Sequence, residues 1–101
     1  MSTKLDILAF AAHPDDVEIS ASGIMIKHKA MGFKTGIVDL TAGELGTRGS
    51  AELRAKEAAS ASQIMGLDVR ENLGLKDGFF EINEDSLIKL IIAIRRYQPE
   101  I

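Results

Sequence analysis

The stretch LDILAFAAHPDD, residues 5–16, decides how this chain folds. Its first seven residues are almost all apolar, which predicts a buried strand. A helical pattern begins immediately after the stretch. The imidazole of His13 and the carboxylates of Asp15 and Asp16 therefore lie where the first strand passes into the first helix. In an open α/β sheet, the carboxyl ends of the strands are the place where ligands bind.

The rest of the chain alternates between helix and strand patterns. A first helix is expected over residues 16–31, and the residues predicted to form its inward stripe are Ile19, Ile24, Met25, His28 and Met31. Strands are expected over 35–41, which is rich in β-branched residues, and over 69–75. Between these two strands, Ser50 is suited to begin a helix and Gly66 to end it.

A third helix is predicted near the carboxyl end of the chain, and it is expected to end before Pro99. Its apolar residues recur at the i, i+3, i+4 and i+7 positions of one helix face, as Leu87, Leu90, Ile91 and Ile94. A fourth strand is expected to start at residues 99–101.

This β-α-β-α-β-α order predicts an α/β fold, namely a Rossmann-like parallel sheet with flanking helices. No internal repeat or linker divides the chain. Because a sheet should not stop on the first residues of a central strand, we interpret residues 1–101 as the N-terminal part of a single domain whose remainder is missing from this chain.

Composition restricts the classes of function. The 101 residues carry a formal net charge of −3, so a basic surface for nucleic acid is not expected. The chain has no cysteine, which excludes disulfides, thiolate zinc sites and cysteine nucleophiles. It shows neither a signal peptide nor an apolar run near the roughly 20 residues of a membrane helix. We therefore expect a cytoplasmic protein that acts on a small molecule, with no membrane or nucleic-acid partner.

The chemistry of His13 and Asp16 suits a metal ion. A neutral imidazole nitrogen and a carboxylate oxygen are good ligands for Zn²⁺, Fe²⁺ or Mn²⁺, and the turn between the two residues can aim both at one point. A zinc ion lowers the pKa of a bound water to about 7. Asp15, which lies between the two ligands in sequence, would remain available to take the proton of that water as a general base. This division of roles predicts a metal-assisted hydrolase.

A catalytic zinc ion usually has three protein ligands, and this turn supplies two. The other histidine, His28, lies about 18 Å beyond Asp16 along the expected helix, so it cannot reach the same ion and is expected on the helix flank. The third ligand is expected beyond Ile101, with Glu44 as an alternative.

The motif Ala-His-Pro-Asp-Asp, with Glu18 two residues later, resembles the PIG-L/LmbE-like N-acetylglucosamine deacetylases. The likeness continues in DLTAGELGTRGS at 39–50, in the helix residues ELR and EA within 52–58, and in NLGLKDG at 72–78. The loop at 39–50 is most similar to the bacillithiol-pathway branch, the N-acetylglucosaminyl-malate deacetylases. One departure is the stretch 20–23, which is usually glycine-rich in the family and is Ser-Ala-Ser-Gly here.

The resemblance implies a zinc-dependent enzyme that removes acetyl from the 2-amino group of a glucosamine conjugate. His13 and Asp16 would be zinc ligands, and Asp15 would be the general base. A histidine ligand and an oxyanion-stabilising histidine would follow the fourth strand, so this segment alone is expected to be inactive. The residues implied to contact substrate are Arg48 and Asp77, and Glu44 is expected either to position Arg48 or to contact the hydroxyl groups of the sugar. Arg48 suits the carboxylate of a malate group.

Simpler and different interpretations stay open. Asp15 or Asp16 as a helix N-cap behind Pro14 would explain one carboxylate, but not the second one or His13. A receiver-like signalling domain also has paired acids after its first strand, although Asp77 is a poor phosphate acceptor for it. A dinucleotide-binding module would need a glycine-rich turn instead. An inactive metal-binding homologue is a further alternative. Phe79 and Phe80 are expected to be core residues, with a lining of the pocket or a homo-oligomer contact as the alternatives.

Overall fold

Parallel strands and helices alternate along the chain. The computed structural model describes residues 4–43, 50–78, 81 and 83–101. The elements in these residues are β1 (Ile7–Ala11), α1 (Asp16–Ser20), α2 (Ser22–Ala30), β2 (Thr35–Thr41), α3 (Ala51–Met65), β3 (Val69–Leu75) and α4 (Glu84–Tyr97). The bounds of β2 and β3 are those that the sequence patterns predict.

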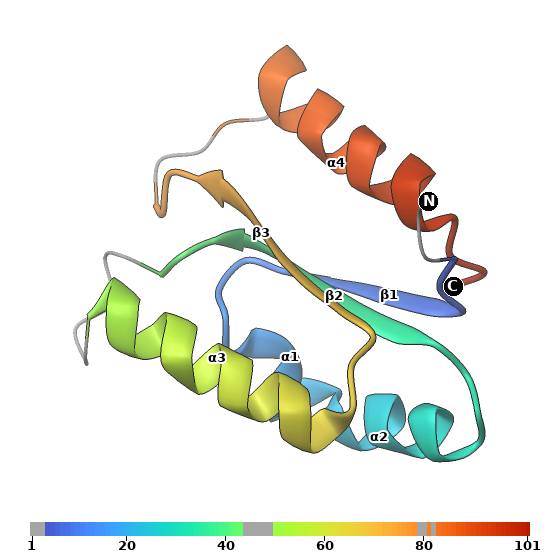
Figure 1. Cartoon of the computed structure of the whole chain (residues 1–101). Helices are drawn as coiled ribbons and strands as arrows, with labels where there is room; N and C mark the ends of the chain where they lie inside the picture. The colour runs from blue at the N-terminus through green and yellow to red at the C-terminus, as the bar shows by residue number, and fades with distance from the viewer. Residues whose placement is uncertain (1–3, 44–49, 79–80, 82) are drawn as a thin grey trace.

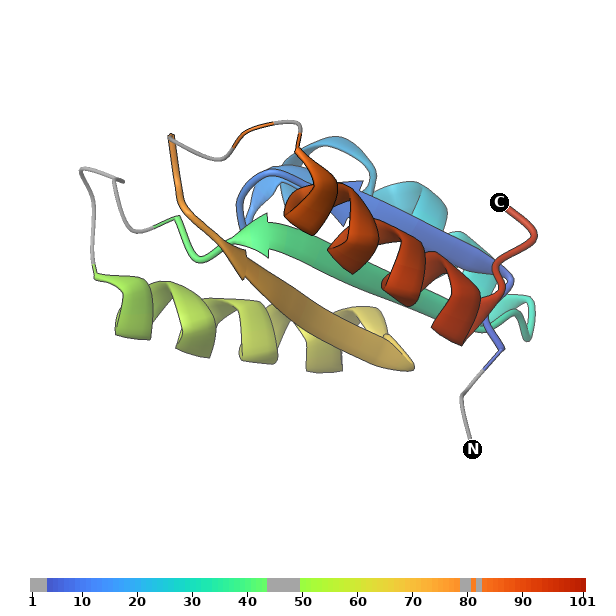
Figure 2. The same ribbon diagram turned by 90° about the horizontal axis from the view of Figure 1, so that it is seen from above.

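The described strands form one parallel sheet in the order β1-β2-β3, with β2 in the centre. Ile7 of β1 pairs with Thr35 of β2, and Gly36 of β2 pairs with Val69 of β3. α4 lies on one face of the sheet, and α1, α2 and α3 lie on the other (Figure 1, Figure 2). This arrangement confirms the predicted fold class, an α/β parallel sheet with flanking helices.

Both faces of the central strand are buried. Ile37 and Val38 are neighbours in β2 and are each 0% exposed, and their side chains project to opposite faces. The cluster that contains Val38 lies under α4 and includes Leu5, Leu8, Ala93 and Tyr97. The cluster that contains Ile37 lies under the other helices and includes Ala11, Val17, Met25 and Met65.

The prediction of one continuous first helix is wrong. α1 ends at Ser20 and α2 begins at Ser22, because Ala21 between them has φ −131° and ψ 9°, outside the helical region. The break changes which residues face the core, because residues three or four positions apart lie on the same face only if the helix between them is unbroken. Met25 is the buried member of the predicted stripe. Three other members are largely exposed, Ile19 at 81%, Ile24 at 60% and Met31 at 62%.

The helix ends agree with the sequence signals. Oγ of Ser50 accepts a hydrogen bond from the backbone N–H of Leu53, and Gly66 ends α3 in the left-handed conformation with φ 69°. α4 ends at Tyr97, before Pro99, as predicted. Within the part of the chain that the structure describes, no helix combines the length and the apolarity needed to span a membrane.

The predicted fourth strand is not seen at residues 99–101, which form no helix or strand in the structure. Ile101 nevertheless hydrogen-bonds beside the start of β1. Its backbone N–H donates to the carbonyl of Asp6 at 3.0 Å, and its carbonyl accepts from the N–H of Leu8 at 3.0 Å. A residue opposite Ile7 in a parallel ladder makes this pair of hydrogen bonds.

Candidate functional site

The turn at residues 12–16, which we call the AHPDD turn, follows the carboxyl end of β1. β1 is an edge strand of the described sheet and pairs with β2. The crevice outside the carboxyl ends of the strands is the usual ligand site of an open α/β sheet. Because the strands are parallel, the segments that follow β2 and β3 begin at the same edge.

His13 is held between two carboxylates that come from distant parts of the chain. Its Nε2 lies 2.7 Å from Oδ1 of Asp77, a residue after β3 that is 5% exposed. Its Nδ1 lies 3.6 Å from Oδ2 of Asp16. The same oxygen of Asp16 accepts a hydrogen bond from the backbone N–H of His13 at 3.0 Å. The turn thus brings together the two residues that the sequence predicts as metal ligands.

The donor atoms of this turn fit a divalent metal ion such as zinc. A neutral imidazole that is protonated at Nε2 donates to Asp77 and leaves the lone pair of Nδ1 on the side of Asp16. Metal-binding histidines commonly have their second ring nitrogen on a carboxylate in this way. Two ligands of one tetrahedral zinc ion lie roughly 3.4 Å apart, and Nδ1 and Oδ2 are separated by 3.6 Å.

The described residues supply only part of the ligand set that a catalytic zinc ion would need. No group of three or more His, Cys, Asp or Glu side chains in this part of the chain is arranged to hold an ion. His13 and Asp16 supply two donors, and a catalytic zinc ion usually takes three from the protein.

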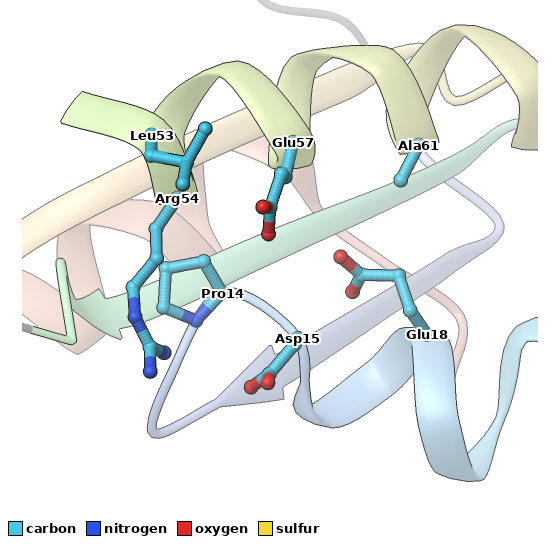
Figure 3. Close-up of a pocket in the computed structure, with 7 residues that line it drawn as sticks. All are labelled: Pro14, Asp15, Glu18, Leu53, Arg54, Glu57 and Ala61. Carbon is cyan, nitrogen blue, oxygen red and sulfur yellow. The ribbon is translucent and has the colours of Figure 1, made fainter. Parts of the chain in front are cut away.

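Asp15 occupies the N-cap position of α1, but its side chain makes no capping hydrogen bond. Asp15 is thus the N-cap residue by position, as the alternative interpretation expects, but its carboxylate does not act as a cap. Asp15 is exposed, and it lines a pocket of about 470 Å³ between α1 and α3. Figure 3 shows the carboxylates of Glu18 and Glu57 pointing toward one another across this pocket. The pocket is also lined by Pro14, Leu53, Arg54 and Ala61.

A half-buried arginine, Arg70 of β3, supports the AHPDD turn, and it was not predicted from the sequence. The guanidinium of Arg70 in β3 donates to both carboxylate oxygens of Asp39 in β2, at 2.8 and 3.1 Å. Its Nη2 also donates to the carbonyl of Pro14 at 2.9 Å and lies 3.4 Å from the carboxylate of Glu18. The signal present in the sequence is Asp39 itself, since a carboxylate inside an apolar strand needs a charged partner.

The Asp39–Arg70 pair depends on both of its members. Burial raises the pKa of the Asp39 carboxyl group above its ordinary value of 3.8, and this effect outweighs the opposing hydrogen bond and charge of Arg70. The charges of Asp16 and Asp15 add to the rise. The side chains of Arg70 and Asp39 are 13% and 4% exposed, so removal of either would leave a buried charge without its partner.

Polar side chains also link the end of β2 to the AHPDD turn and to the middle of β3. Oγ1 of Thr41 in β2 donates to the carbonyl of Ala12 at 2.8 Å, directly before His13. Nδ2 of Asn72 in β3 donates to the carbonyl of Thr41 at 2.7 Å. Sequence reasoning did not single out Thr41 or Asn72, because their partners are backbone carbonyls on other strands.

The remaining predicted residues divide into two groups. Glu44 and Arg48 lie outside the described residues, as do Phe79 and Phe80. Asp77 is described, and its carboxylate contacts His13; its contact with substrate stays a prediction. His28 lies on the helix flank, with Nδ1 2.8 Å from the carbonyl of Ile24.

Comparison with known proteins gives consistent results. Residues 8–101 match the PIG-L family, which is described as GlcNAc-PI de-N-acetylase. The conserved protein TT1542 from Thermus thermophilus has a similar structure, with a TM-score of 0.88 and 48% identity over 94% of this chain and 43% of that one. N,N'-diacetylchitobiose deacetylase from Pyrococcus horikoshii, complexed with its inhibitor MPG, has a TM-score of 0.86 and 27% identity over 92% of this chain and 38% of that one.

A third similar structure has a different activity. GalB, the 4-carboxy-2-hydroxymuconate hydratase from Pseudomonas putida KT2440, has a TM-score of 0.82 and 28% identity over 100% of this chain and 45% of that one. The present chain thus spans less than half the length of each of the three proteins.

Proposed function

The chain belongs to the PIG-L family, and on that basis we propose that it serves a metal-dependent amidohydrolase. The proposed reaction removes acetyl from the 2-acetamido group of an N-acetylglucosamine conjugate. The family description names a de-N-acetylase, and one similar structure is a deacetylase of N,N'-diacetylchitobiose. The observation that carries the proposal is the placement of His13, whose Nε2 contacts Asp77 while its Nδ1 lies 3.6 Å from Oδ2 of Asp16.

His13, through Nδ1, and Asp16, through Oδ2, would hold the metal. Zn²⁺ is the proposed ion, and Fe²⁺ and Mn²⁺ are the alternatives for a site of one imidazole and one carboxylate. Zinc bound there would polarise the acetyl carbonyl and make a water molecule more acidic. The third protein ligand is expected outside the described residues, where Glu44 is one candidate.

Asp15 is the proposed general base. Its carboxylate is exposed, makes no capping hydrogen bond and follows the ligand His13 by two residues. It would accept one proton from water while the oxygen of that water bonds to the acetyl carbon. The proton would then pass to the amide nitrogen as the C–N bond breaks. The second proton of the water leaves the new carboxyl group and protonates the amine, so the products are acetate and an ammonium ion, and atoms and charges balance.

The proposed substrate carries a carboxylate on its aglycone, as N-acetylglucosaminyl-malate of bacillithiol biosynthesis does. Arg48 suits bidentate contact with that carboxylate, and Glu44 and Asp77 suit the hydroxyl groups of the sugar. The pocket beside Asp15 has about 470 Å³, which is within the usual range for small ligands. Its lining includes Arg54, a second cation for an acidic group.

A hydratase is the second candidate, because the hydratase GalB is as similar in sequence to this chain as the chitobiose deacetylase is. Both reactions require an activated water molecule, so the AHPDD turn would serve either one. The products differ. Amide hydrolysis releases acetate and an amine, whereas hydration adds water to a double bond and releases nothing.

The test uses the complete polypeptide that the gene encodes, with Zn²⁺ added, and N-acetylglucosaminyl-malate as substrate. We expect acetate and free amine to appear in equal amounts, to stop when a chelator is added and to resume when Zn²⁺ is restored. N-Acetylglucosamine without the malate group tests the carboxylate contact. If no N-acetylglucosamine conjugate releases acetate and 4-carboxy-2-hydroxymuconate is consumed instead, the deacetylase proposal is wrong and the hydratase is favoured.

A further inference from the structure

Three consecutive residues of the AHPDD turn are each held by a side chain from a different place in the fold. These contacts join Thr41 to the carbonyl of Ala12, Asp77 to the ring of His13, and Arg70 to the carbonyl of Pro14. Thr41 is the last residue of β2, and Asp77 follows β3. Arg70 differs from both, because it is the second residue of β3 and its long side chain contacts both Asp39 of β2 and the turn.

We infer that Arg70 is a positioning residue that sets the separation of His13 and Asp16. The inference rests on the metal site proposed above. Pro14 lies between the proposed ligand His13 and the proposed base Asp15, so the 2.9 Å hydrogen bond to its carbonyl fixes the backbone at the centre of the turn. The same Nη2 lies 3.4 Å from both carboxylate oxygens of Glu18, in the helix that carries Asp16.

The geometry of these contacts requires the guanidinium of arginine and cannot be satisfied by another cationic side chain. Nε and Nη2 both donate to Asp39, while Nη2 has a second hydrogen for the carbonyl of Pro14. Nη1 lies 3.4 Å from Oγ of Ser62 in α3. A planar guanidinium can serve these directions at once, whereas the single ammonium group of lysine cannot. Arg70→Lys therefore keeps a charge near Asp39 but loses the fixed link to the turn.

If Arg70 had a purely structural role, its ion pair with Asp39 would be its only important contact. The pair Asp39–Arg70 would then stabilise the sheet, and the contact with Pro14 would have no effect on the turn. The two roles separate when both charges are removed together. Asp39→Leu combined with Arg70→Met leaves no buried charge, and such paired replacements are often neutral or stabilising. This double variant still lacks a donor for the carbonyl of Pro14.

The experiment measures metal binding in the complete polypeptide that the gene encodes. Zinc affinity is obtained by competition with a chromophoric chelator, and Co²⁺ is used as a spectroscopic probe of the ligand geometry. The variants are Arg70→Lys, Arg70→Met and the double variant D39L/R70M. Arg96→Met is the matched control, because Arg96 also pairs with a carboxylate of β3, Glu71 at 3.2 Å, but belongs to α4, on the face of the sheet opposite α1. Thermal unfolding establishes that each variant is folded.

We expect each Arg70 variant that folds, including D39L/R70M, to bind zinc 10- to 100-fold more weakly than the wild type, with an altered Co²⁺ spectrum. Arg96→Met should bind like the wild type. If D39L/R70M or Arg70→Lys is folded and has wild-type zinc affinity and an unchanged Co²⁺ spectrum, Arg70 is structural only and the inference is wrong. A wild-type protein that binds no metal would instead overturn the proposed function, and the inference with it.

Discussion

Nε2 of His13 lies 2.7 Å from Oδ1 of Asp77, although 64 residues separate them in the chain. The contact joins the end of β1 to the segment after β3. The side chain of Asp77 is 6% exposed, whereas that of His13 is 40% exposed. The buried carboxylate therefore fixes the inward nitrogen of the ring, and Nδ1 is left toward Asp16 and solvent. One hydrogen bond thus sets both the tautomer and the orientation of the proposed ligand.

Replacement of Asp77 tests this relationship. We expect Asp77→Ala to weaken zinc binding by about 10- to 100-fold, because the ring of His13 loses the partner that holds Nδ1 toward Asp16. Nitrogen NMR of metal-free protein should show a single Nε2–H tautomer for His13 in the wild type and a mixture in the variant. Asp85→Asn, an exposed change in α4, is the control and should alter neither quantity. Unchanged zinc affinity together with a higher KM would show that Asp77 contacts substrate instead.

Replacement of Asp15 tests the general base. Asp15→Asn keeps the size of the side chain but removes its basicity, so we expect bound zinc to remain and acetate release to fall by about 10²- to 10⁴-fold. Zinc content and acetate release are measured on the same protein sample. Asp16→Asn is the informative comparison, because loss of a ligand should lower zinc content as well as turnover. Turnover of Asp15→Asn at the wild-type rate would remove Asp15 from the mechanism.

The strands and helix ends could be predicted from sequence because their signals are local. The β-branched run at 35–41 and the residues Ser50 and Gly66 each act within a few positions of the chain. The break at Ala21 could not be predicted in this way, since the helical spacing continues across it. Because the break was not predicted, Ile19 was wrongly assigned to the core, although it is exposed.

The site was predictable only as far as one turn determines it. The spacing of His13 and Asp16 predicts their proximity, and the parallel sheet predicts that Asp77 lies at the same edge. Which nitrogen Asp77 contacts depends on tertiary packing, and no periodicity records it. The pairing of Asp39 with Arg70 likewise depends on the register of two strands, so the arginine that supports the turn was missed.

The contribution of Asp68 to the stability of the fold should decrease at acidic pH. Burial raises the pKa of this carboxyl group, but hydrogen bonds from Lys29 at 2.9 Å and from the backbone N–H of Thr35 at 2.8 Å lower it below its ordinary value of 3.8 overall. A carboxyl group whose pKa is lower in the folded state than in the unfolded state stabilises the folded protein at pH values above the unfolded-state pKa. This stability is lost as the pH falls from 3.8 through the lower pKa of the folded state.

We therefore expect Asp68→Asn to be less stable than the wild type at pH 7, by less than about 1 kcal/mol because the ion pair is near the surface. The difference should shrink as the pH falls below 3.8, the ordinary value of the carboxyl pKa. Urea unfolding at neutral and acidic pH measures it. Lys29→Met removes the same ion pair from its other side and should reduce the pH dependence in the same direction. A stability difference that grows on acidification would contradict the sign of the shift.

Two glycines provide an opposed pair of tests for the packing of the sheet. A Cβ at Gly36 in β2 would lie 2.6 Å from Cδ1 of Leu5 and 3.1 Å from Cβ of Val69. Leu5 is 0% exposed, so its side chain has little room to move away. A Cβ at Gly23 in α2 would meet no atom within 4 Å. Gly36 therefore has no room for a Cβ atom, whereas Gly23 does.

We expect Gly36→Ala to destabilise the protein by about 1–3 kcal/mol, as overpacked cores do. Gly23→Ala should instead stabilise it by up to about 1 kcal/mol, because alanine restricts the unfolded chain and favours a helix. Urea unfolding of both variants under the same conditions measures the two effects, and a shared slope shows that the unfolded states are comparable. Equal stability of Gly36→Ala and the wild type would mean that Leu5 can repack, and that the core cluster under α4 is packed more loosely than the complete burial of Leu5 indicates.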